Sequence, residues 1–169
     1  HDEKLDVGSE RDDLCKRDTS KTSRRAVSQA NYNSNYQDGN ASDDEVEYQG
    51  EPAMKAACHC LPCRKTSGTT NSYNLMIPSD KYKILSGSLK SFTRKGDSGK
   101  NVTYNSCQNC PTVLYVQAEA LEGLNIVKAG TVDDEDVFNN LGKPKAEIYT
   151  KNRPSWCDAI PGAEQKETS

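Results

Sequence analysis

Hydrophobic and polar residues follow each other in short runs along the chain from Val46 onward. Several of these runs alternate with the period of two that is typical of half-buried strands, and glycine or proline separates them. The expected strands cover residues 46–48, 72–77, 82–85, 89–94, 101–104, 112–116, 124–129 and 146–150. Short strands at this spacing predict a mainly β fold with antiparallel pairing.

Two of the connecting segments carry signals of their own. Residues 95–100 contain two glycines, which adopt positive φ angles without steric cost, so we expect a hairpin between the strands on either side. Residues 133–138 begin with a run of acidic side chains, as the first turn of a helix favours. They form the best helix candidate, and it is a short one.

The first 45 residues differ from the rest of the chain. They are basic around residues 20–25, rich in asparagine at 31–40 and acidic at 42–45, with neither a helical nor a strand period. Such a segment buries too little apolar surface to offset the entropy lost on ordering. We therefore expect a poorly ordered polar arm at residues 1–45, an ordered domain at 46–165 and a tail at 166–169.

Composition indicates a small domain whose core needs additional stabilisation. Of the 169 residues, 33% are hydrophobic and 28% are charged, which is lean for a core, and metal ions or disulfides usually compensate in such cases. The chain has seven cysteines, an odd number. Several lie too close together for unstrained mutual disulfides, which favours metal binding in a reducing compartment.

Composition also narrows the expected location and partners. No apolar run is long enough for a signal peptide or a membrane span, and a net charge of −3 gives no electrostatic reason for binding nucleic acid. We expect a soluble cytoplasmic protein with neither a membrane nor a nucleic-acid partner. The sequence gives no indication of its oligomeric state.

The strongest candidate for chemistry is a cluster of three cysteines, Cys58, Cys60 and Cys63. Zn²⁺ binds thiolates at about 2.3 Å in tetrahedral geometry, so three of them leave one position open. Three thiolates give such a site a net negative charge, so it favours binding an incoming thiol over generating hydroxide. Arg64 and Lys65 follow directly and would hold a substrate carboxylate.

A second reading of the cluster stays open, because a fourth protein ligand such as Cys107 would make the site structural. Cys107 and Cys110 have the spacing of a zinc knuckle, but they supply only two of the four ligands that a structural zinc needs. The remaining cysteines are Cys15 and Cys157. A thioredoxin-like redox role for the pair is disfavoured, because no βαβ pattern surrounds it.

Three further residues near these motifs attract attention. His59, between two cysteines of the cluster, would be a ligand, a base or a spacer. Neighbouring side chains in extended backbone point apart, so we favour a position behind the ligands or on the surface. Trp156 is expected in the core or as the lid of a pocket, and Cys157 as an inert, partly buried thiol.

The order of these motifs resembles that of a known family. They are Cys58-His59-Cys60, Cys63-Arg64-Lys65, Ser67-Gly68, Cys107 with Cys110, Gly130-Thr131, and Arg153 with Trp156. From about Glu47 to Gln165 the chain resembles the glutathione-dependent formaldehyde-activating enzyme family, its fungal-type members in particular, a family that includes centromere protein V. The resemblance implies a β-tent of small antiparallel sheets. It also implies carbon–sulfur lyase activity, which joins glutathione and formaldehyde reversibly as S-hydroxymethylglutathione.

The resemblance assigns a catalytic zinc to the first cluster. Cys58, Cys60 and Cys63 would be its three thiolate ligands, and a substrate thiol would take the fourth position. Arg64 or Lys65 would then orient the substrate carboxylates, and Ser67 and Gly68 would shape the floor of the pocket.

The resemblance also implies a second, structural zinc, with Cys107 and Cys110 as two of its four ligands. The family takes the other two from an early C-x-C-G motif, whereas here the only cysteine before the cluster is Cys15. We expect Cys15 to serve as a single substitute ligand, with water or Asp13 completing the site. Pro111 stands where the family has a glycine, which removes one N–H that would bond a thiolate.

These observations give one leading hypothesis and two alternatives. The first is a zinc-dependent carbon–sulfur lyase that acts on a thiol adduct, with glutathione as its small-molecule partner. The alternatives are a non-catalytic zinc-stabilised binding module and a biosynthetic enzyme that reuses the same pocket. The group in the fourth position of the first cluster distinguishes an enzyme from a structural module.

Overall fold

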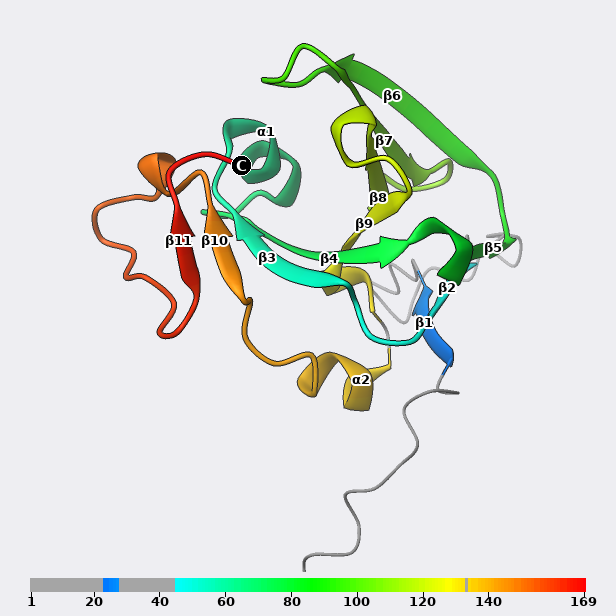
Figure 1. Ribbon diagram of the computed structural model, residues 1–169. Helices are drawn as coiled ribbons and strands as arrows, with labels where there is room; N and C mark the ends of the chain where they lie inside the picture. The colour runs from blue at the N-terminus through cyan, green and yellow to red at the C-terminus, as the bar shows by residue number, and fades with distance from the viewer. Residues whose placement is uncertain (1–22, 28–44, 133) are drawn as a thin grey trace, which may run out of the picture.

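The computed structural model describes residues 23–27, 45–132 and 134–169 (Figure 1). The strands are β1 (Ser23–Val27), β2 (Glu45–Gln49), β3 (Met54–Cys58), β4 (Ser72–Pro78), β5 (Tyr82–Ser86), β6 (Leu89–Lys95), β7 (Asn101–Cys107), β8 (Val113–Ala118), β9 (Leu124–Lys128), β10 (Ala146–Ile148) and β11 (Glu164–Lys166). The helices are α1 (Leu61–Ser67) and α2 (Glu135–Asn139), with single 3₁₀ turns at Ser79–Lys81, Glu119–Leu121, Ala129–Thr131 and Thr150–Asn152.

Two sheets organise these strands. The smaller sheet is antiparallel, with the order β1-β2-β5, and the larger has eight strands in the order β11-β10-β3-β4-β9-β8-β7-β6. All pairings from β3 to β6 are antiparallel, whereas β10 lies parallel to both β3 and β11. In Figure 1, α1 lies between the β10–β3 side and the β7–β6 side of the larger sheet.

The hydrophobic core lies on one face of the larger sheet. Leu75 and Ile77 of β4 and Val127 of β9 are fully buried there. Val46 and Tyr48 of β2 belong to the same cluster, so the smaller sheet packs against this face. Because successive side chains of a strand point to opposite faces, the core fixes which residues of β4 and β9 point the other way.

The opposite face of the same strands borders a cavity. Asn74 and Met76 of β4 and Ile126 and Lys128 of β9 line this cavity, and they alternate with the core residues along each strand. A single sheet therefore carries both the core and the candidate site.

The predicted mainly β fold is confirmed, and each of the predicted strands has a counterpart. The hairpin is present as well: β6 and β7 pair antiparallel, and Gly99 in the connection has a φ of 74°. The predicted helix corresponds to α2, whose N-cap Asp134 accepts a hydrogen bond from the Val137 N–H at 2.9 Å. Antiparallel pairing alone does not describe the sheet, because β10 joins it by two parallel pairings.

The structure adds elements that the alternation pattern does not reveal. β1 falls within the segment expected to be a polar arm, and it pairs along its length with β2; residues 1–22 and 28–44 lie outside the described residues. β3 and α1 enclose the cysteine cluster, where the sequence pattern predicts neither a strand nor a helix. β11 includes Lys166, the first residue of the expected tail. The division of the chain into arm, domain and tail stays a prediction.

The helices in the described part of the chain are all too short or too polar to cross a membrane.

Candidate metal and substrate site

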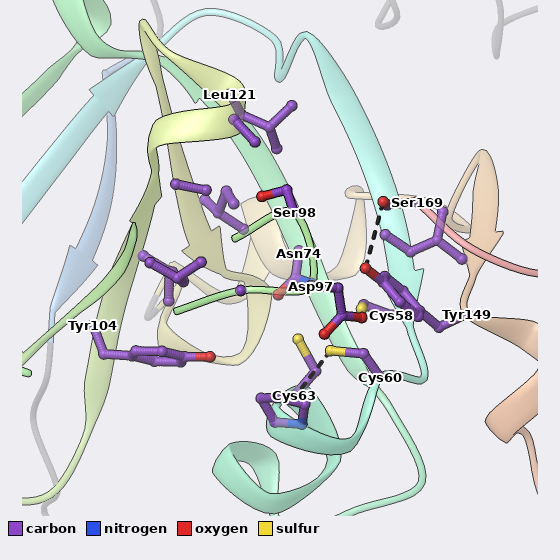
Figure 2. A pocket seen from close by; sticks show the side chains of 18 of the residues that line it. Cys58, Cys60, Cys63, Asn74, Asp97, Ser98, Tyr104, Leu121, Tyr149 and Ser169 are labelled. Atoms are coloured by element: carbon purple, nitrogen blue, oxygen red, sulfur yellow. Dashed lines mark hydrogen bonds between the residues drawn. The ribbon is translucent and has the colours of Figure 1, made fainter. Parts of the chain in front are cut away.

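The three cysteines predicted to form a metal site converge in the structure. Cys58 ends β3, Cys60 precedes α1 and Cys63 lies in its first turn. Their Sγ atoms all lie within 4.8 Å of one another (Figure 2). Sulfur atoms around a tetrahedral zinc lie roughly 3.8 Å apart, given zinc–sulfur distances of about 2.3 Å, so the cluster is close to the size that zinc requires.

Helix α1 brings Cys60 and Cys63 together by capping. The Cys60 Sγ is the N-cap group and accepts a hydrogen bond from the Cys63 N–H at 3.4 Å. Pro62 occupies the first turn, where its missing N–H costs nothing, and Gly68 ends the helix with a φ of 68°. The proline and glycine that suggest a turn in the sequence are therefore the start and end signals of a short helix.

The pKa values of the cluster thiols are shifted in opposite directions. The thiols of Cys58 and Cys60 donate hydrogen bonds to the sulfur of Cys63 and, with help from the charge of Lys128, lower the pKa of Cys63 to about 3. The pKa of Cys58 is raised, first by its hydrogen bonds to the other two sulfurs and then by burial. Three thiolates this close together repel one another, so a positive ion between them favours their ionisation. This soft donor set suits Zn²⁺.

A lysine outside the cysteine motifs provides positive charge beside the cluster. Lys128 of β9 pairs with Asn74 of β4 in the sheet register, and its Nζ donates to the Asn74 Oδ1 and the Ser72 Oγ, each at 3.0 Å. Ser72 and Asn74 are each only 4% exposed. The ammonium group is therefore held in one place next to Cys63.

A cavity of about 410 Å³ begins at the cluster. All three cysteines line it, and residues of strands β4, β9, β8 and β7 form its wall. Figure 2 shows Leu121 at the far end from the cysteines, with Asp97 and Tyr149 near Cys60. The cluster is therefore accessible to a small molecule bound in this cavity.

Tyr149 is held at the cavity in an unusual backbone conformation. Among the described residues it is the only non-glycine residue with a positive φ, 57°, a conformation that costs energy for a side chain with a Cβ. Its N–H donates to the Thr168 carbonyl oxygen at 3.3 Å, and its hydroxyl lies 3.4 Å from the Ser169 Oγ. The hydrogen bond with Ser169 lowers the pKa of Tyr149, but burial and the charge of Asp97 outweigh it, so the pKa is raised overall.

A buried carboxylate supports the cysteine loop from behind. Glu147 of β10 is 1% exposed, and its Oε1 lies 2.9 Å from the Nε2 of the fully buried His59. Its other oxygen accepts hydrogen bonds from the Ile160 N–H and the Gln165 side chain, both at 2.7 Å, and from Arg153 at 3.2 Å. Glu147 thus ties the loop between the cluster cysteines to the C-terminal segment.

The structure decides between the roles considered for His59. It is not on the surface, and it is outside the group of candidate metal ligands found among the described residues. Its N–H donates to the Ile148 carbonyl oxygen at 3.0 Å, and its ring bonds Glu147, so it holds the loop in place behind the ligands. The expectation for Trp156 is wrong, because 76% of this residue is exposed.

Arg64, Lys65 and Ser67 lie outside this cavity. All three are exposed on α1, and the Ser67 Oγ bonds backbone and side-chain groups of its own loop, including the Asn71 carbonyl oxygen at 2.8 Å. The cations that line the cavity are instead Arg94 and Lys128. The role of the three α1 residues in binding substrate carboxylates stays a prediction.

Cys107 and Cys110 form half of a second site, as their spacing suggests. The Cys107 Sγ accepts hydrogen bonds from the N–H groups of Asn109 and Cys110, each at 3.3 Å, an arrangement that favours a thiolate. Neither residue belongs to the group formed by the first cluster. Cys15 and Asp13, the further ligands expected, lie outside the described residues.

Sequence reasoning missed Lys128, Asn74, Tyr149 and Glu147. One signal was available in the sequence. Lys128 falls on the same strand face as the apolar Ile126, and a cation on such a face needs a polar or negatively charged partner. The other three depend on β3, β10 and the C-terminal segment meeting in space, which the local pattern does not encode.

Two comparisons with known proteins bear on this site. The model of one protein family, described as glutathione-dependent formaldehyde-activating enzyme, matches residues 42–152, which is more than half of the chain. The matched segment contains both cysteine motifs. No curated protein matches the chain.

The hydrogen bonds of Glu147 predict a specific acid sensitivity. Burial alone raises the pKa of Glu147, but the donors around it outweigh burial and lower its pKa to about 2. Since an unfolded glutamate titrates near 4.3, the ionised group stabilises the fold above that pH, and this stability, on the order of 3 kcal/mol, is lost as the pH falls toward 2. In Glu147→Gln we expect a smaller loss of unfolding free energy over this range than in the wild type, measured by denaturant titration at each pH.

Glu164→Gln serves as the matched control, because the side chain of Glu164 is 64% exposed. It should follow the wild-type pH dependence. Equal pH dependence for Glu147→Gln and the wild type would contradict the assigned role of Glu147.

Proposed function

The chain belongs to the glutathione-dependent formaldehyde-activating enzyme family, and from this premise we propose that it is a zinc-dependent carbon–sulfur lyase. Its substrate would be a thiol adduct such as S-hydroxymethylglutathione. The observation that carries the proposal is the convergence of three cysteine sulfurs at one end of a cavity. Within residues 23–27, 45–132 and 134–169, the group contains no fourth histidine, cysteine or carboxylate.

Cys58, Cys60 and Cys63 would hold the zinc ion. When bound, zinc would supply positive charge and a free coordination position for the sulfur of the substrate. The free position is what the proposal requires, because a closed site would have only a structural role.

Residues of the chain stabilise the charge that the substrate sulfur develops. As the carbon–sulfur bond breaks, its electron pair stays on the sulfur, and the Lys128 ammonium beside Cys63 offsets this negative charge. Asn74 and Ser72 fix the ammonium by hydrogen bonds, so little reorganisation accompanies the reaction.

The proton of the adduct hydroxyl must leave as the carbonyl product forms. We assign this role to the polar groups near Cys60, where Asp97 can accept the proton directly or through water. The raised pKa of Tyr149 keeps its hydroxyl protonated near neutral pH, so it can donate a hydrogen bond to the substrate oxygen. In the direction of synthesis the same groups return the proton.

The remaining assignments follow from this proposal. Arg64, Lys65 and Ser67 would contact only those parts of glutathione that extend beyond the cavity. Cys107 and Cys110, with Cys15, would bind a structural zinc. Because the site needs reduced thiols, we place the protein in a reducing compartment such as the cytoplasm.

Metal analysis of cysteine variants tests the first part of the proposal. Cys58→Ser should contain one zinc equivalent less per chain than the wild type and should form no S-hydroxymethylglutathione from glutathione and formaldehyde above the uncatalysed rate. Cys157→Ser is the matched control, since Cys157 lies outside the cluster, and both its metal content and its rate should equal those of the wild type. Full zinc content in Cys58→Ser would rule out the cluster as the metal site. Zinc binding without acceleration in the wild type would favour the non-catalytic module.

Substitution of Lys128 tests the electrostatic part. In Lys128→Met we expect the dissociation constant of glutathione, measured by calorimetry on zinc-loaded protein, to rise about tenfold, which corresponds to about 1.4 kcal/mol. Lys151→Met removes the same charge from an exposed position outside the cavity and should leave the affinity unchanged. An equal effect of both substitutions would show that Lys128 acts only through overall charge.

A further inference from the structure

The wall of the cavity changes from polar to apolar with distance from the cysteines. The sheet register places Asn74 opposite Lys128 in the row beside Cys63. One row further along the strands, Met76 pairs with Ile126, and Ile126 pairs with Val116 of β8. All of these side chains line the cavity.

A second apolar row follows the first. Val102 of β7 pairs with Ala118 of β8, and both line the cavity together with Leu121 from the 3₁₀ turn after β8. Figure 2 shows Leu121 at the end opposite the cysteines. Residues two apart along a strand are separated by about 6.6 Å, so the two apolar rows extend roughly 7–13 Å from the polar row.

The charged group at the level of the far row is Arg94 of β6, which pairs with Val102 in the sheet register and donates to Tyr104 and to its own strand. The Arg94 guanidinium lies over the Tyr104 ring at 5.8 Å, its Nε donates to the Tyr104 hydroxyl at 3.3 Å, and its Nη1 donates to the Lys95 carbonyl oxygen at 2.7 Å. Burying the carboxylates and amides of a peptide against the apolar rows would leave them without hydrogen bonds, which is costly. Asp97 and Tyr149, which lie near Cys60, suit the polar parts of glutathione better.

Formaldehyde provides nothing to fill the apolar rows. Its adduct adds a single carbon to the sulfur, and that carbon lies next to the cluster. We propose that the carbonyl partner of this protein carries an apolar substituent, roughly six to ten carbons long so that in extended form it reaches the two apolar rows, and that this substituent occupies the far part of the cavity. The inference rests on the proposed function and specifies its substrate class.

The reaction stays balanced with such a partner. The thiol sulfur bonds to the carbonyl carbon of the aldehyde, the carbonyl π pair moves to oxygen, and the thiol proton ends on that oxygen, giving a 1-hydroxyalkyl thioether. The reverse reaction breaks the carbon–sulfur bond and returns the proton to sulfur. No oxidant or reductant takes part.

Calorimetry with S-alkylglutathiones of increasing length measures the apolar rows without any turnover. On zinc-loaded full-length protein, we expect S-hexylglutathione to bind at least tenfold more tightly than S-methylglutathione, with S-butylglutathione between them, because each added methylene leaves water. Equal affinities, or weaker binding of the longer chains, would overturn the inference.

A variant that fills the far row tests the location. Ala118→Phe should reduce the ratio of hexyl to methyl affinity to about one, whereas Ala53→Phe, at an exposed position outside the cavity, should keep the wild-type ratio. A wild-type ratio in Ala118→Phe would overturn the assignment of the far row. If thermal melting shows that Ala118→Phe does not fold, Leu121→Ser takes its place, since 37% of Leu121 is exposed; it should lower the ratio severalfold, and an unchanged ratio would again overturn the assignment.

The same titrations separate this inference from the proposed function. If glutathione and all three conjugates fail to bind, the proposed function is contradicted, and the inference with it. If glutathione binds and the length of the alkyl chain has no effect, only the inference is contradicted.

Discussion

Negative charge gathered on three sulfur atoms is the constraint on which the site depends. The Sγ atoms of Cys58, Cys60 and Cys63 lie within 4.8 Å of one another, and the low pKa of Cys63 coexists with a raised pKa of Cys58. Three thiolates at these distances repel one another, so a cation between them favours the ionised form of the cluster. Lys128 supplies part of the positive charge from the strand beside it, and a divalent metal ion would supply the rest. Under the proposed function a substrate thiolate would add a further negative charge, which the fixed lysine next to the cluster would offset.

The larger sheet makes this arrangement possible because one of its faces packs against the core and the other lines the cavity. Leu75 and Val127 bury their side chains in the core, while their neighbours Asn74 and Lys128 point into the cavity. Stability and chemistry are therefore carried by adjacent residues of the same strands. Two residues in and next to β10 carry an energetic cost: Tyr149, directly after the strand, is held in a left-handed backbone conformation, and Glu147 within it is buried as a carboxylate. Both are stabilised by contacts with the C-terminal segment, so that segment is part of the site.

Sequence reasoning predicted those features that depend on local pattern. Alternating residues indicated the strands from β2 to β10 except β3, and the spacing of the cysteines indicated the group that could hold a metal ion. β3 was missed because it is buried on its cysteine side and its five residues do not alternate clearly. α1 was missed because Pro62 and Gly68 signal both a turn and the two ends of a short helix. β1 and β11 depend on pairing with distant strands, and nothing in their own sequences compels it.

The residues around the cluster also depend on contacts between distant parts of the chain, which the local sequence pattern does not predict. Arg64 and Lys65 were natural candidates because they follow the cysteines directly, but a helix turns them toward solvent, away from the cavity. Lys128 lies 65 positions after Cys63 in the chain and reaches it only because β4 and β9 pair in one particular register. Distance along the sequence is thus a poor guide to which cation meets the thiolates.

X-ray absorption at the zinc edge tests the central claim most directly, in the Cys107→Ser and Cys110→Ser double variant, so that only the first cluster contributes. The account predicts three sulfur neighbours at about 2.3 Å and one lighter atom for the protein alone, and four sulfur neighbours after addition of glutathione. A zinc ion that already has four protein ligands, and whose spectrum glutathione leaves unchanged, would contradict it.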